Sequence, residues 1–442
     1  MKRLLGEAGF FAYLDALNQP YARALRVNLL LRPDGTPPCP IEGLGAPVPW
    51  AKGAYFVEGD ARPGLSPLHE GGLFYMQEPS ALTAVTALDP QPGERVLDLC
   101  AAPGGKSTQI AALMAGRGLL CCNEPIPSRA QILSRNIERM GVRNAVVLSA
   151  MPDALAPRFP AFFDRILVDA PCSGEGMFRR QPEARDEWDA DAPRRCADRQ
   201  MEILAQAAKM LRPGGTMVYS TCTFNDTENE GVLRRFLALH PEFSLVPFAL
   251  PGLPEAKVGY LHLYPHEMRG EGHFVSRLKK ADGADEADAP VQAAPQRKAP
   301  ARAAAKGKAP APIALPDVFS DAFAPERLYT AGDALWMLPE GISIERLSGL
   351  RVLRTGLLLA HAEGKRSEPD HALAMALRPE EAARTASLTQ TQALAYQAGE
   401  TLSLGNLPGG YTLLCCEGVS LGWGKQAGGL MKNHYPKGLR RR

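Results

Sequence analysis

The sequence lacks the features that would place the protein outside the cell or in a membrane. No apolar run approaches the roughly 18 residues that a membrane-spanning helix needs. The first helical pattern contains Glu7 and Asp15, which argues against a signal peptide. None of the nine cysteines forms a C-x-x-C pair, so neither a zinc ribbon nor a thioredoxin-type motif is indicated. We therefore expect reduced thiols in a cytoplasmic protein that makes no membrane contact.

A strong excess of charge is also missing, and so is any internal repeat. The net charge is only +2, which excludes a uniformly basic surface for nucleic acid but allows local basic patches. Hydrophobic residues make up 45% and charged residues 22% of the chain, as in ordinary globular proteins. With 442 residues the chain is too long for a single core, so we expect two or three domains. We expect the protein to be a monomer.

Composition divides the chain into four segments. Residues 1–75 carry one helical pattern, Leu4 to Leu17, and then a stretch rich in Pro and Gly, which we interpret as an N-terminal arm. Residues 76–280 form the largest unit. Residues 281–312 are mostly Ala, Pro, Lys, Asp and Gly, which cannot bury a core, so we interpret them as a disordered linker. Residues 313–442 regain an apolar pattern and form one or two small C-terminal modules.

Short apolar strands alternate with helical stretches in the largest segment. The expected strands are Arg95–Cys100, Leu119–Asn123, Ala145–Leu148, Arg165–Asp169 and Met217–Cys222. The expected helices are Lys106–Met114, Arg129–Met140 and Arg199–Leu211, the last one ending at Pro213-Gly214-Gly215. This alternation predicts an α/β fold with a doubly wound parallel sheet. Ligands of such sheets bind at the carboxyl ends of the strands, so residues that follow the strands are the candidates for a site.

A tight loop with two glycines follows the first expected strand. Its small residues allow a close turn against a ligand, and the next helix points its free N–H groups at that ligand. The loop is Cys100-Ala101-Ala102-Pro103-Gly104-Gly105-Lys106-Ser107. It is not a P-loop, because Cys100 stands where G-x-x-x-x-G-K-[ST] needs its first glycine, and the dinucleotide fingerprint G-x-G-x-x-G is absent. Glu124 after the second strand suits a ribose diol, so we expect an adenosine-type ligand; a plain strand-to-helix turn is the alternative.

Two cysteines follow strands that are expected to be neighbours. Cys172 stands in Asp169-Ala170-Pro171-Cys172, and Cys222 ends the stretch YSTC. Cysteine is more often a buried, inert residue than a catalyst, and two cysteines at the mouth of one site weigh against that interpretation. We keep the inert interpretation for Cys39, Cys121, Cys122, Cys196, Cys415 and Cys416.

The three motifs of the site resemble those of a known family. LDLCAAPGGKS, VDAPCSGEGMFR and YSTCTF, in this order, are similar to the motifs of Sun-type RNA cytosine-5 methyltransferases. The resemblance continues through GEGHF at residues 270–274, and LGWGK and KNHYPKGL near the C-terminus resemble the bacterial RsmF-like branch, which acts on small-subunit ribosomal RNA. It implies a Rossmann-like methyltransferase core with C-terminal PUA-like RNA-binding modules and an RNA-binding N-terminal arm. It also implies S-adenosylmethionine as cofactor and ribosomal RNA or the small ribosomal subunit as partner.

The resemblance assigns roles to individual residues. Cys100 to Lys106 would wrap the S-adenosylmethionine, with Glu124 on its ribose and Arg129 nearby. Asp169 would lie between the methionine end of the cofactor and the cytosine. Cys222 corresponds to the nucleophile, and Cys172 to the second cysteine, which assists product release. The third strand departs from the family pattern: it is followed by Ser149-Ala150-Met151-Pro152-Asp153, which leaves the residue beside the adenine unassigned.

The chemistry of cytosine explains why these residue types are needed. Carbon 5 is a poor nucleophile, and a thiolate that adds to carbon 6 makes carbon 5 enamine-like. A proton donor or hydrogen bond at N3 favours the addition, a role that suits Asp169 if it is protonated when the base is bound. In DNA cytosine-5 methyltransferases the nucleophile belongs to a Pro-Cys motif, which would point to Cys172 rather than Cys222. Chemistry alone does not choose between the two thiols.

Two other functions compete with this interpretation. Amino-group methyltransferases use an Asp/Asn-Pro-Pro-aromatic motif at the fourth strand, and Asp169-Ala170-Pro171-Cys172 lacks its second proline and its aromatic residue. A non-catalytic RNA-binding or ribosome assembly factor would not need the intact cysteines and cofactor loop.

Basic and aromatic residues gather at the C-terminus without any acid among them. Such a segment suits phosphate contact and base stacking, and a solvated tail is the alternative. The residues are Trp423, Lys425, Lys432, His434, Tyr435, Lys437, Arg440, Arg441 and Arg442. Arg179, Arg180 and Arg185, just after Cys172, are further candidates for phosphate contact, with a solvated face as the alternative.

Overall fold

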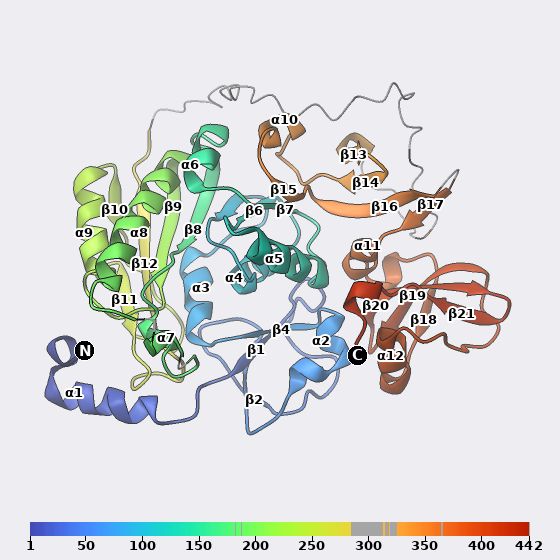
Figure 1. Ribbon diagram of the computed structural model, residues 1–442, viewed down its shortest axis with the longest axis horizontal. Helices are drawn as coiled ribbons and strands as arrows, with labels where there is room; N and C mark the ends of the chain where they lie inside the picture. Colours follow the sequence, from blue (N-terminus) through green and yellow to red (C-terminus); the bar gives the residue numbers. More distant parts are fainter. Residues whose placement is uncertain are drawn as a thin grey trace.

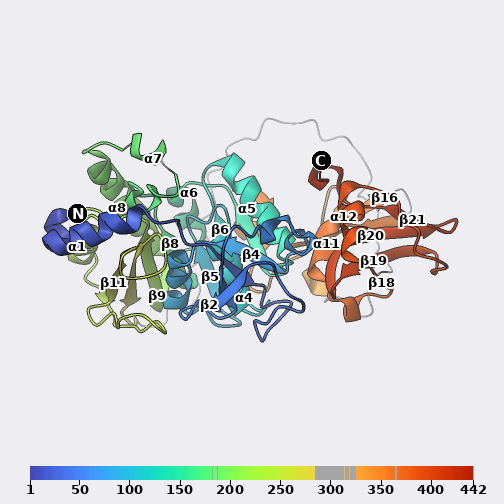
Figure 2. The same cartoon turned by 90° about the horizontal axis from the view of Figure 1, so that it is seen from below.

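The computed structural model describes residues 1–181, 183–186, 188–283, 313, 318, 325–363 and 366–441. Of the expected linker, residues 281–312, all but the first three lie outside the described residues. The described chain is elongated, with the N-terminal helix at one end of the long axis and the last modules at the other (Figures 1 and 2). In these ranges no helix combines the length and the apolar character that crossing a bilayer requires.

A nine-stranded sheet forms the centre of the molecule. Its strand order is β10-β12-β9-β8-β5-β6-β7-β15, with β11 paired to β12. The strands are β5 (Arg95–Asp98), β6 (Leu119–Asn123), β7 (Ala145–Leu148), β8 (Phe163–Asp169), β9 (Leu211–Thr221), β10 (Phe243–Leu245), β11 (Tyr260–Leu263), β12 (His273–Lys280) and β15 (Val352–Arg354). Strands β9, β8, β5, β6 and β7 run parallel, whereas β12 and β15 are antiparallel to their neighbours. The predicted parallel α/β sheet is thus confirmed.

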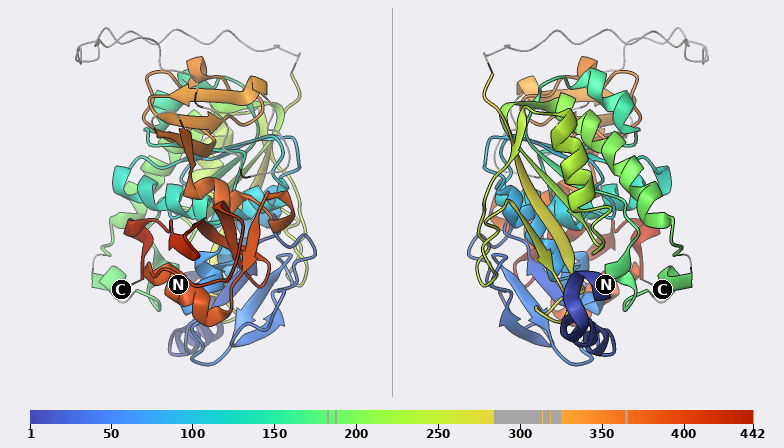
Figure 3. Two further views of the ribbon diagram at one scale, coloured as in Figure 1. Left: turned by 90° about the vertical axis from the view of Figure 1, so that its right-hand side faces the viewer. Right: turned by 90° about the vertical axis from the view of Figure 1, so that its left-hand side faces the viewer.

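Helices cover both faces of this sheet, because successive residues of a strand point to opposite sides. Val96 packs in the core on the side of α3 (Thr83–Leu88), α4 (Gly105–Leu113) and α5 (Pro127–Arg139). Leu97 packs on the other side, with α6 (Pro152–Leu155), α8 (Ala192–Met210) and α9 (Glu230–Leu239). The right-hand view of Figure 3 shows α8 and α9, in green, to one side of the yellow strand β12. Cys122 and Cys121 follow the same alternation and are fully buried, one in each core.

The break predicted at Pro213-Gly214-Gly215 lies inside β9 instead of before it. The pairing of β8 with β9 passes from Phe163 opposite Leu211 directly to Arg165 opposite Thr216, so the intervening residues bulge out of the ladder. Gly214 has a φ of +68°, a left-handed conformation that glycine adopts without strain.

The N-terminal segment combines a helix with a small sheet. Helix α1 (Lys2–Leu17) contains the predicted Leu4–Leu17 and is interrupted at Gly6, where φ is +68°. The sheet has the order β2-β3-β1-β4. Its strands are β1 (Ala24–Val27), β2 (Leu44–Pro47), β3 (Ala54–Val57) and β4 (Phe74–Gln77), and the short helices nearby are η1 (Pro63–Leu65), α2 (Pro67–Glu70) and η2 (Ser80–Leu82).

The central region also contains the short elements η3 (Ala156–Arg158), η4 (Glu175–Met177) and α7 (Glu183–Asp186). Two four-stranded sheets follow after residue 325. The first contains β13 (Leu328–Ala331), β14 (Ala334–Met337), β16 (Leu357–Glu363) and β17 (Arg366–Pro369), and the second β18 (Thr385–Ser387), β19 (Gly410–Cys416), β20 (Val419–Ala427) and β21 (Leu430–Asn433). Their helices are η5 (Pro325–Arg327), α10 (Ile344–Leu347), α11 (His371–Ala376), η6 (Pro379–Glu381), α12 (Gln390–Ala398) and η7 (Lys437–Leu439).

Strand pairing and a shared hydrophobic core both attach the C-terminal part to the rest of the molecule. Strand β15 extends the central sheet, with Val352 opposite Leu148 of β7. The last module shares a hydrophobic core with the N-terminal sheet, in which Leu25 and Phe74 pack in one cluster with Tyr396 and Leu414. The red and blue regions accordingly lie side by side in Figure 3.

Candidate active site

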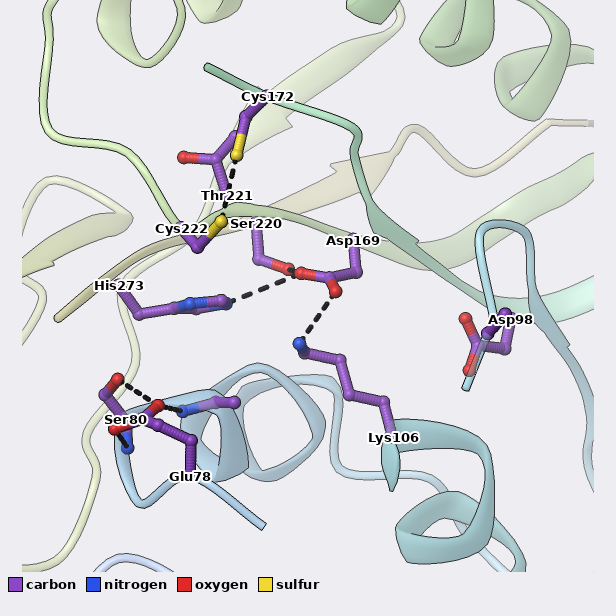
Figure 4. A network of polar contacts seen from close by, with 12 residues as sticks. Glu78, Ser80, Asp98, Lys106, Asp169, Cys172, Ser220, Thr221, Cys222 and His273 are labelled. Carbon is purple, nitrogen blue, oxygen red and sulfur yellow. Dashed lines mark hydrogen bonds and ion pairs between the residues drawn. The ribbon is translucent and has the colours of Figure 1, made fainter. Parts of the chain in front are cut away.

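Two cysteine-bearing segments meet where β8 and β9 end (Figure 4). The strands are parallel, with Asp169 opposite Ser220, so their carboxyl ends lie at one edge of the sheet. Beyond that edge the Sγ atoms of Cys172 and Cys222 are 3.1 Å apart. The amide of Gly176 donates to the carbonyl oxygen of Cys222 over 2.8 Å and ties the two segments together. The structure thus brings together the two cysteines selected from the sequence.

The two sulfur atoms differ in their electrostatic surroundings. The hydrogen bond with Cys222, followed by burial, raises the pKa of Cys172 well above the usual thiol value. Cys172 is therefore held as a neutral thiol in hydrogen-bond contact with the sulfur of Cys222. Burial lowers the pKa of Lys106, but the charges of Asp169 and Cys222 raise it overall. The sulfur of Cys222 thus lies within the electrostatic field of the Lys106 ammonium group.

Asp169, the last residue of β8, has partners at both carboxylate oxygens. Its Oδ2 accepts from Nζ of Lys106 at 2.7 Å, and its Oδ1 accepts from Oγ of Ser220 at 2.8 Å. Nε2 of His273, which is buried on β12, lies 3.5 Å from Oδ1. Burial raises the pKa of Asp169, but Lys106 and then His273 outweigh it, so the pKa falls below its ordinary value. Asp169 is therefore a carboxylate in the protein without a bound base, and its role as a proton donor to a bound base stays a prediction.

Of the predicted cofactor residues, Cys100 to Lys106, the first five form the loop between β5 and α4, and Gly105 and Lys106 begin α4. Gly104 precedes the helix with a φ of +114°, which favours glycine. The first N–H groups of α4 have no partner within the helix and point away from its start. Arg129 on α5 donates to the carbonyl oxygen of Ala102 at 3.2 Å and holds the loop in place.

Glu124 follows β6 and is buried beside this loop. Its Oε1 accepts from the amide of Ile126 at 3.0 Å, and its Oε2 lies 3.5 Å from Nη1 of Arg129. The predicted ribose contact and its predicted neighbour therefore lie together. Arg129 is half exposed, so it can move when a ligand arrives.

Asp98, at the end of β5, is fully buried and has incomplete hydrogen bonding. Its Oδ2 accepts from Oγ of Ser107 at 2.6 Å, whereas its buried Oδ1 has no partner within the described part of the chain. Burial raises the pKa of Asp98 to about 7. A cationic ligand group here would stabilise the carboxylate and meet the free oxygen. S-adenosylmethionine, with an ammonium and a sulfonium group beside a ribose, fits this set of residues.

Four residues of the site were not identified from the sequence. His273 was part of the GEGHF resemblance without a role, and Ser220 was part of a strand. Asp98 interrupts an apolar strand, a signal that could have been used. Glu78, seen below His273 in Figure 4, accepts from the amides of neighbouring residues and of Glu271 at 2.8 Å, and no pattern pointed to it.

Arg179, a predicted phosphate contact, is engaged within the protein. Its Nε and Nη2 donate to the carboxylate of Glu271 over 2.9 and 2.6 Å, and its Nη1 donates to the carbonyl oxygen of Ala16 over 2.7 Å. The side chains of the pair are only 9% and 3% exposed. Arg179 thus ties α1 to the segments around the site, and its prediction was wrong. Arg180 and Arg185 are exposed and stay candidates.

Part of the basic C-terminal segment is structural as well. Trp423 and Tyr435 are buried in hydrophobic cores, so the prediction that they stack on bases was wrong. Arg441 donates to the carbonyl oxygens of Leu65 and Ser66 at 2.6 and 3.0 Å and fastens the tail to the N-terminal segment. Lys432 and Lys437 are exposed. Arg442 lies outside the described residues.

Four family models match successive parts of the chain. The model of 16S rRNA methyltransferase RsmB/F matches residues 85–279. The N-terminal domain of 16S rRNA methyltransferase RsmF matches residues 1–79, the RsmF rRNA methyltransferase first C-terminal domain residues 316–377, and the methyltransferase RsmF PUA domain residues 383–441.

Individual proteins are similar over the same length. Ribosomal RNA small subunit methyltransferase F of Erwinia tasmaniensis is 33% identical over 463 residues, covering 99% of this chain and 95% of that protein. The protein of the same name from Enterobacter sp. (strain 638) is 35% identical over 453 residues, covering 97% and 92%. Among solved structures, the methyltransferase homolog protein from Pyrococcus horikoshii is 29% identical with a TM-score of 0.51, over 63% of this chain and 97% of that one.

Proposed function

Because the chain belongs to the RsmB/F family of 16S rRNA methyltransferases, we propose that it methylates carbon 5 of a cytosine in small-subunit ribosomal RNA through a covalent adduct on Cys222. The methyl donor is S-adenosylmethionine. The observation that carries the proposal is the pair of thiols, 3.1 Å apart, beside the ion pair of Lys106 and Asp169. Methylation of an amino group needs no thiol, whereas methylation of carbon 5 needs a nucleophile and a base for release.

S-adenosylmethionine, when bound, supplies an electrophilic methyl group on a sulfonium centre. The residues Cys100 to Lys106 would hold it, because the loop and the free N–H groups of α4 form a close, polar turn. Glu124 would accept from the ribose hydroxyls. Asp98, with its free oxygen, would hold the cationic part.

The first step is addition of the Cys222 thiolate to carbon 6 of the cytosine. A sulfur electron pair forms the S–C6 bond, the π electrons of the C5–C6 bond make carbon 5 nucleophilic, and N3 takes up a proton. Lys106 stabilises the thiolate before the attack, and as an ammonium ion it carries the proton that N3 needs. The carboxylate of Asp169 suits the exocyclic amino group of cytosine as an acceptor, a group that uracil lacks.

Release of the product requires removal of the hydrogen that carbon 5 keeps after methyl transfer. In the free enzyme, the hydrogen bond with Cys222 is the first cause of the raised pKa of Cys172. A Cys222 sulfur bound to carbon 6 is an uncharged thioether, so this cause disappears and Cys172 ionises more readily. Cys172 then takes the proton from carbon 5, the C5–C6 double bond re-forms, and the electron pair of the S–C6 bond returns to Cys222. N3 loses its proton in the same elimination step.

A groove of about 830 Å³, lined by none of the catalytic residues themselves, would take the RNA strand beside the target. It runs between the end of α1, the N-terminal sheet and residues 265–270, and it includes the exposed Arg62. It reaches Arg179 and Gly270, next to Glu271. In this proposal the N-terminal arm, residues 1–75, and the C-terminal modules bind RNA around the catalytic core.

The test is methyl transfer from labelled S-adenosylmethionine to 16S ribosomal RNA from cells that lack the protein. Both naked RNA and assembled small subunits are offered, and the product is digested to nucleosides. The proposal expects the label in 5-methylcytidine. Label in N4-methylcytidine or in a ribose-methylated nucleoside would overturn it.

A further inference from the structure

Each cysteine-bearing segment is held by a carboxylate from the other segment. Glu175 stands in η4, shortly after Cys172, and its contacts lie after Cys222. Glu228 stands before α9, shortly after Cys222, and it holds Ser173, beside Cys172, in addition to its contacts with Gln200 and Asn225. The two carboxylates therefore form a reciprocal clasp around the pair of sulfur atoms.

Glu175 holds the segment that follows Cys222. Its Oε2 accepts from the amide of Phe224 at 2.8 Å, the amide of Asn225 at 3.0 Å and Oγ1 of Thr223 at 2.8 Å. All three donors thus meet one oxygen, and Oε1 has a single, longer contact of 3.4 Å, with Nδ2 of Asn225.

Glu228 holds the residue that follows Cys172. Its Oε2 accepts from the amide of Ser173 at 3.0 Å and from Nε2 of Gln200 at 2.8 Å. Its Oε1 accepts from Nδ2 of Asn225 at 2.8 Å and from the hydroxyl of Ser173. Glu228 is fully buried, so this set of donors replaces water around its carboxylate. Both of its oxygens are in use, in contrast to Glu175.

We propose that Glu175 and Glu228 are positioning residues with separate tasks: Glu175 places Cys222 for attack on the base, and Glu228 places Cys172 for release of the product. This inference rests on the proposed function, because it assigns one carboxylate to each of the two thiol steps. An error of about 1 Å in the placement of a reacting group costs roughly 10²-fold in rate. Loosening one segment therefore affects the step of the cysteine that it carries.

The separate tasks predict opposite effects on the covalent protein–RNA adduct. Glu175→Ala should lower the single-turnover rate of methyl transfer at least about tenfold and give no trapped adduct, because Cys222 is displaced. Glu228→Ala should keep the first turnover and lower multiple turnover at least about tenfold, because the adduct forms and is not released. The fraction of adduct is read on a denaturing gel with labelled RNA and saturating cofactor.

Glutamine variants separate this role from general folding. Glu175→Gln keeps one acceptor oxygen for its three donors and should restore most of the activity. Glu228→Gln must place an NH2 group against donors at one of its two oxygens, so it should still accumulate adduct. Glu202→Ala, an exposed carboxylate on α8, is the control and should behave like the wild type. Thermal unfolding is measured for every variant.

Two outcomes are decisive. If Glu175 and Glu228 variants lower both steps equally, in proportion to lost thermal stability, the clasp is only structural and the inference is overturned. Cys222→Ala and Cys172→Ala are run on the same gel. If Cys222→Ala still methylates RNA, the proposed function itself has failed. If Cys222→Ala is inactive and Cys172→Ala accumulates adduct, as the proposed function expects, the failure is confined to the clasp.

Discussion

The ammonium group of Lys106 lies 2.7 Å from Oδ2 of Asp169, where the first turn of α4 meets the end of β8. Lys106 belongs to the predicted cofactor loop and Asp169 to the predicted catalytic segment. Their contact links the two halves of the site and helps to keep Asp169 ionised, because Lys106 and His273 together outweigh the effect of burial on its pKa.

Replacing Lys106 by Met should leave the carboxylate of Asp169 buried without its main partner. We expect a loss of about 2–4 kcal/mol of stability at neutral pH, together with the loss of methyl transfer. In the wild type the folded pKa of Asp169 is below its unfolded value, so its contribution is present above the unfolded pKa and is lost as the pH falls through the folded one. The difference between the two proteins should therefore shrink below about pH 4, as Asp169 of the variant takes up a proton. The free energies of unfolding of the wild type and Lys106→Met, measured at neutral pH and below about pH 4, check this. An equal difference between the two proteins at both pH values would contradict it.

Asp98 should couple cofactor binding to pH. Burial raises its pKa to about 7, so the unliganded protein carries a proton there at slightly acidic pH. A cationic ligand favours the ionised form, so affinity for S-adenosylmethionine should rise by up to about tenfold per pH unit below pH 7 and level off above it. Calorimetry between about pH 5.5 and about pH 7.5 measures this slope and the released proton. Asp98→Asn should remove the slope; an unchanged slope would assign it to another group.

The buried pair of Arg179 and Glu271 should matter for stability more than for RNA affinity. Glu271→Ala leaves the guanidinium of Arg179 buried without its carboxylate, which typically costs about 3–5 kcal/mol. We expect a lower melting temperature and an unchanged dependence of RNA affinity on salt. Arg180→Ala serves as the comparison, because an exposed arginine that contacts phosphate should lower the salt slope by about one. A reduced salt slope for Arg179→Met, which removes the positive charge, would return Arg179 to the phosphate contacts.

Arg441 should stabilise the packing of the C-terminal tail against the N-terminal segment. Arg441→Ala removes two hydrogen bonds to the carbonyl oxygens of Leu65 and Ser66. We expect a loss of about 1–3 kcal/mol, since charged hydrogen bonds are worth about that much, with the salt dependence of RNA binding unchanged. Lys432→Ala is the control, because it removes an exposed positive charge of the same C-terminal segment. Normal stability combined with a flatter salt dependence for Arg441→Ala would show that Arg441 contacts RNA instead.

Local patterns in the sequence were enough for the central fold and the cysteine pair. The alternation of strands and helices predicted the parallel sheet, and parallel order brings the ends of β8 and β9 to one edge. Cys172 and Cys222 therefore had to lie close together once their strands were neighbours. The loop after β5 and Glu124 after β6 lie at the same edge for the same reason, because their strands run parallel to β8 and β9.

What could not be predicted depends on contacts between distant parts of the chain. Strand β15 joins the central sheet from beyond the linker, and its three residues carry no pattern of their own. Trp423 and Tyr435 have the composition of an RNA-binding tail, and only packing against other modules buries them. His273 reaches Asp169 because antiparallel β12 lies beside β9, a pairing that the alternation of strands and helices does not contain.

The central claim is that Cys222 attacks the base and Cys172 releases the product. The most direct measurement is a denaturing gel of wild type, Cys222→Ala and Cys172→Ala, each incubated with labelled 16S ribosomal RNA and S-adenosylmethionine. The structure holds Cys172 as a thiol beside Cys222, so Cys172→Ala should transfer the methyl group and accumulate a slow protein–RNA band. Cys222→Ala should give neither methylated RNA nor that band. The slow band in Cys222→Ala and its absence in Cys172→Ala would reverse the two roles and contradict the account.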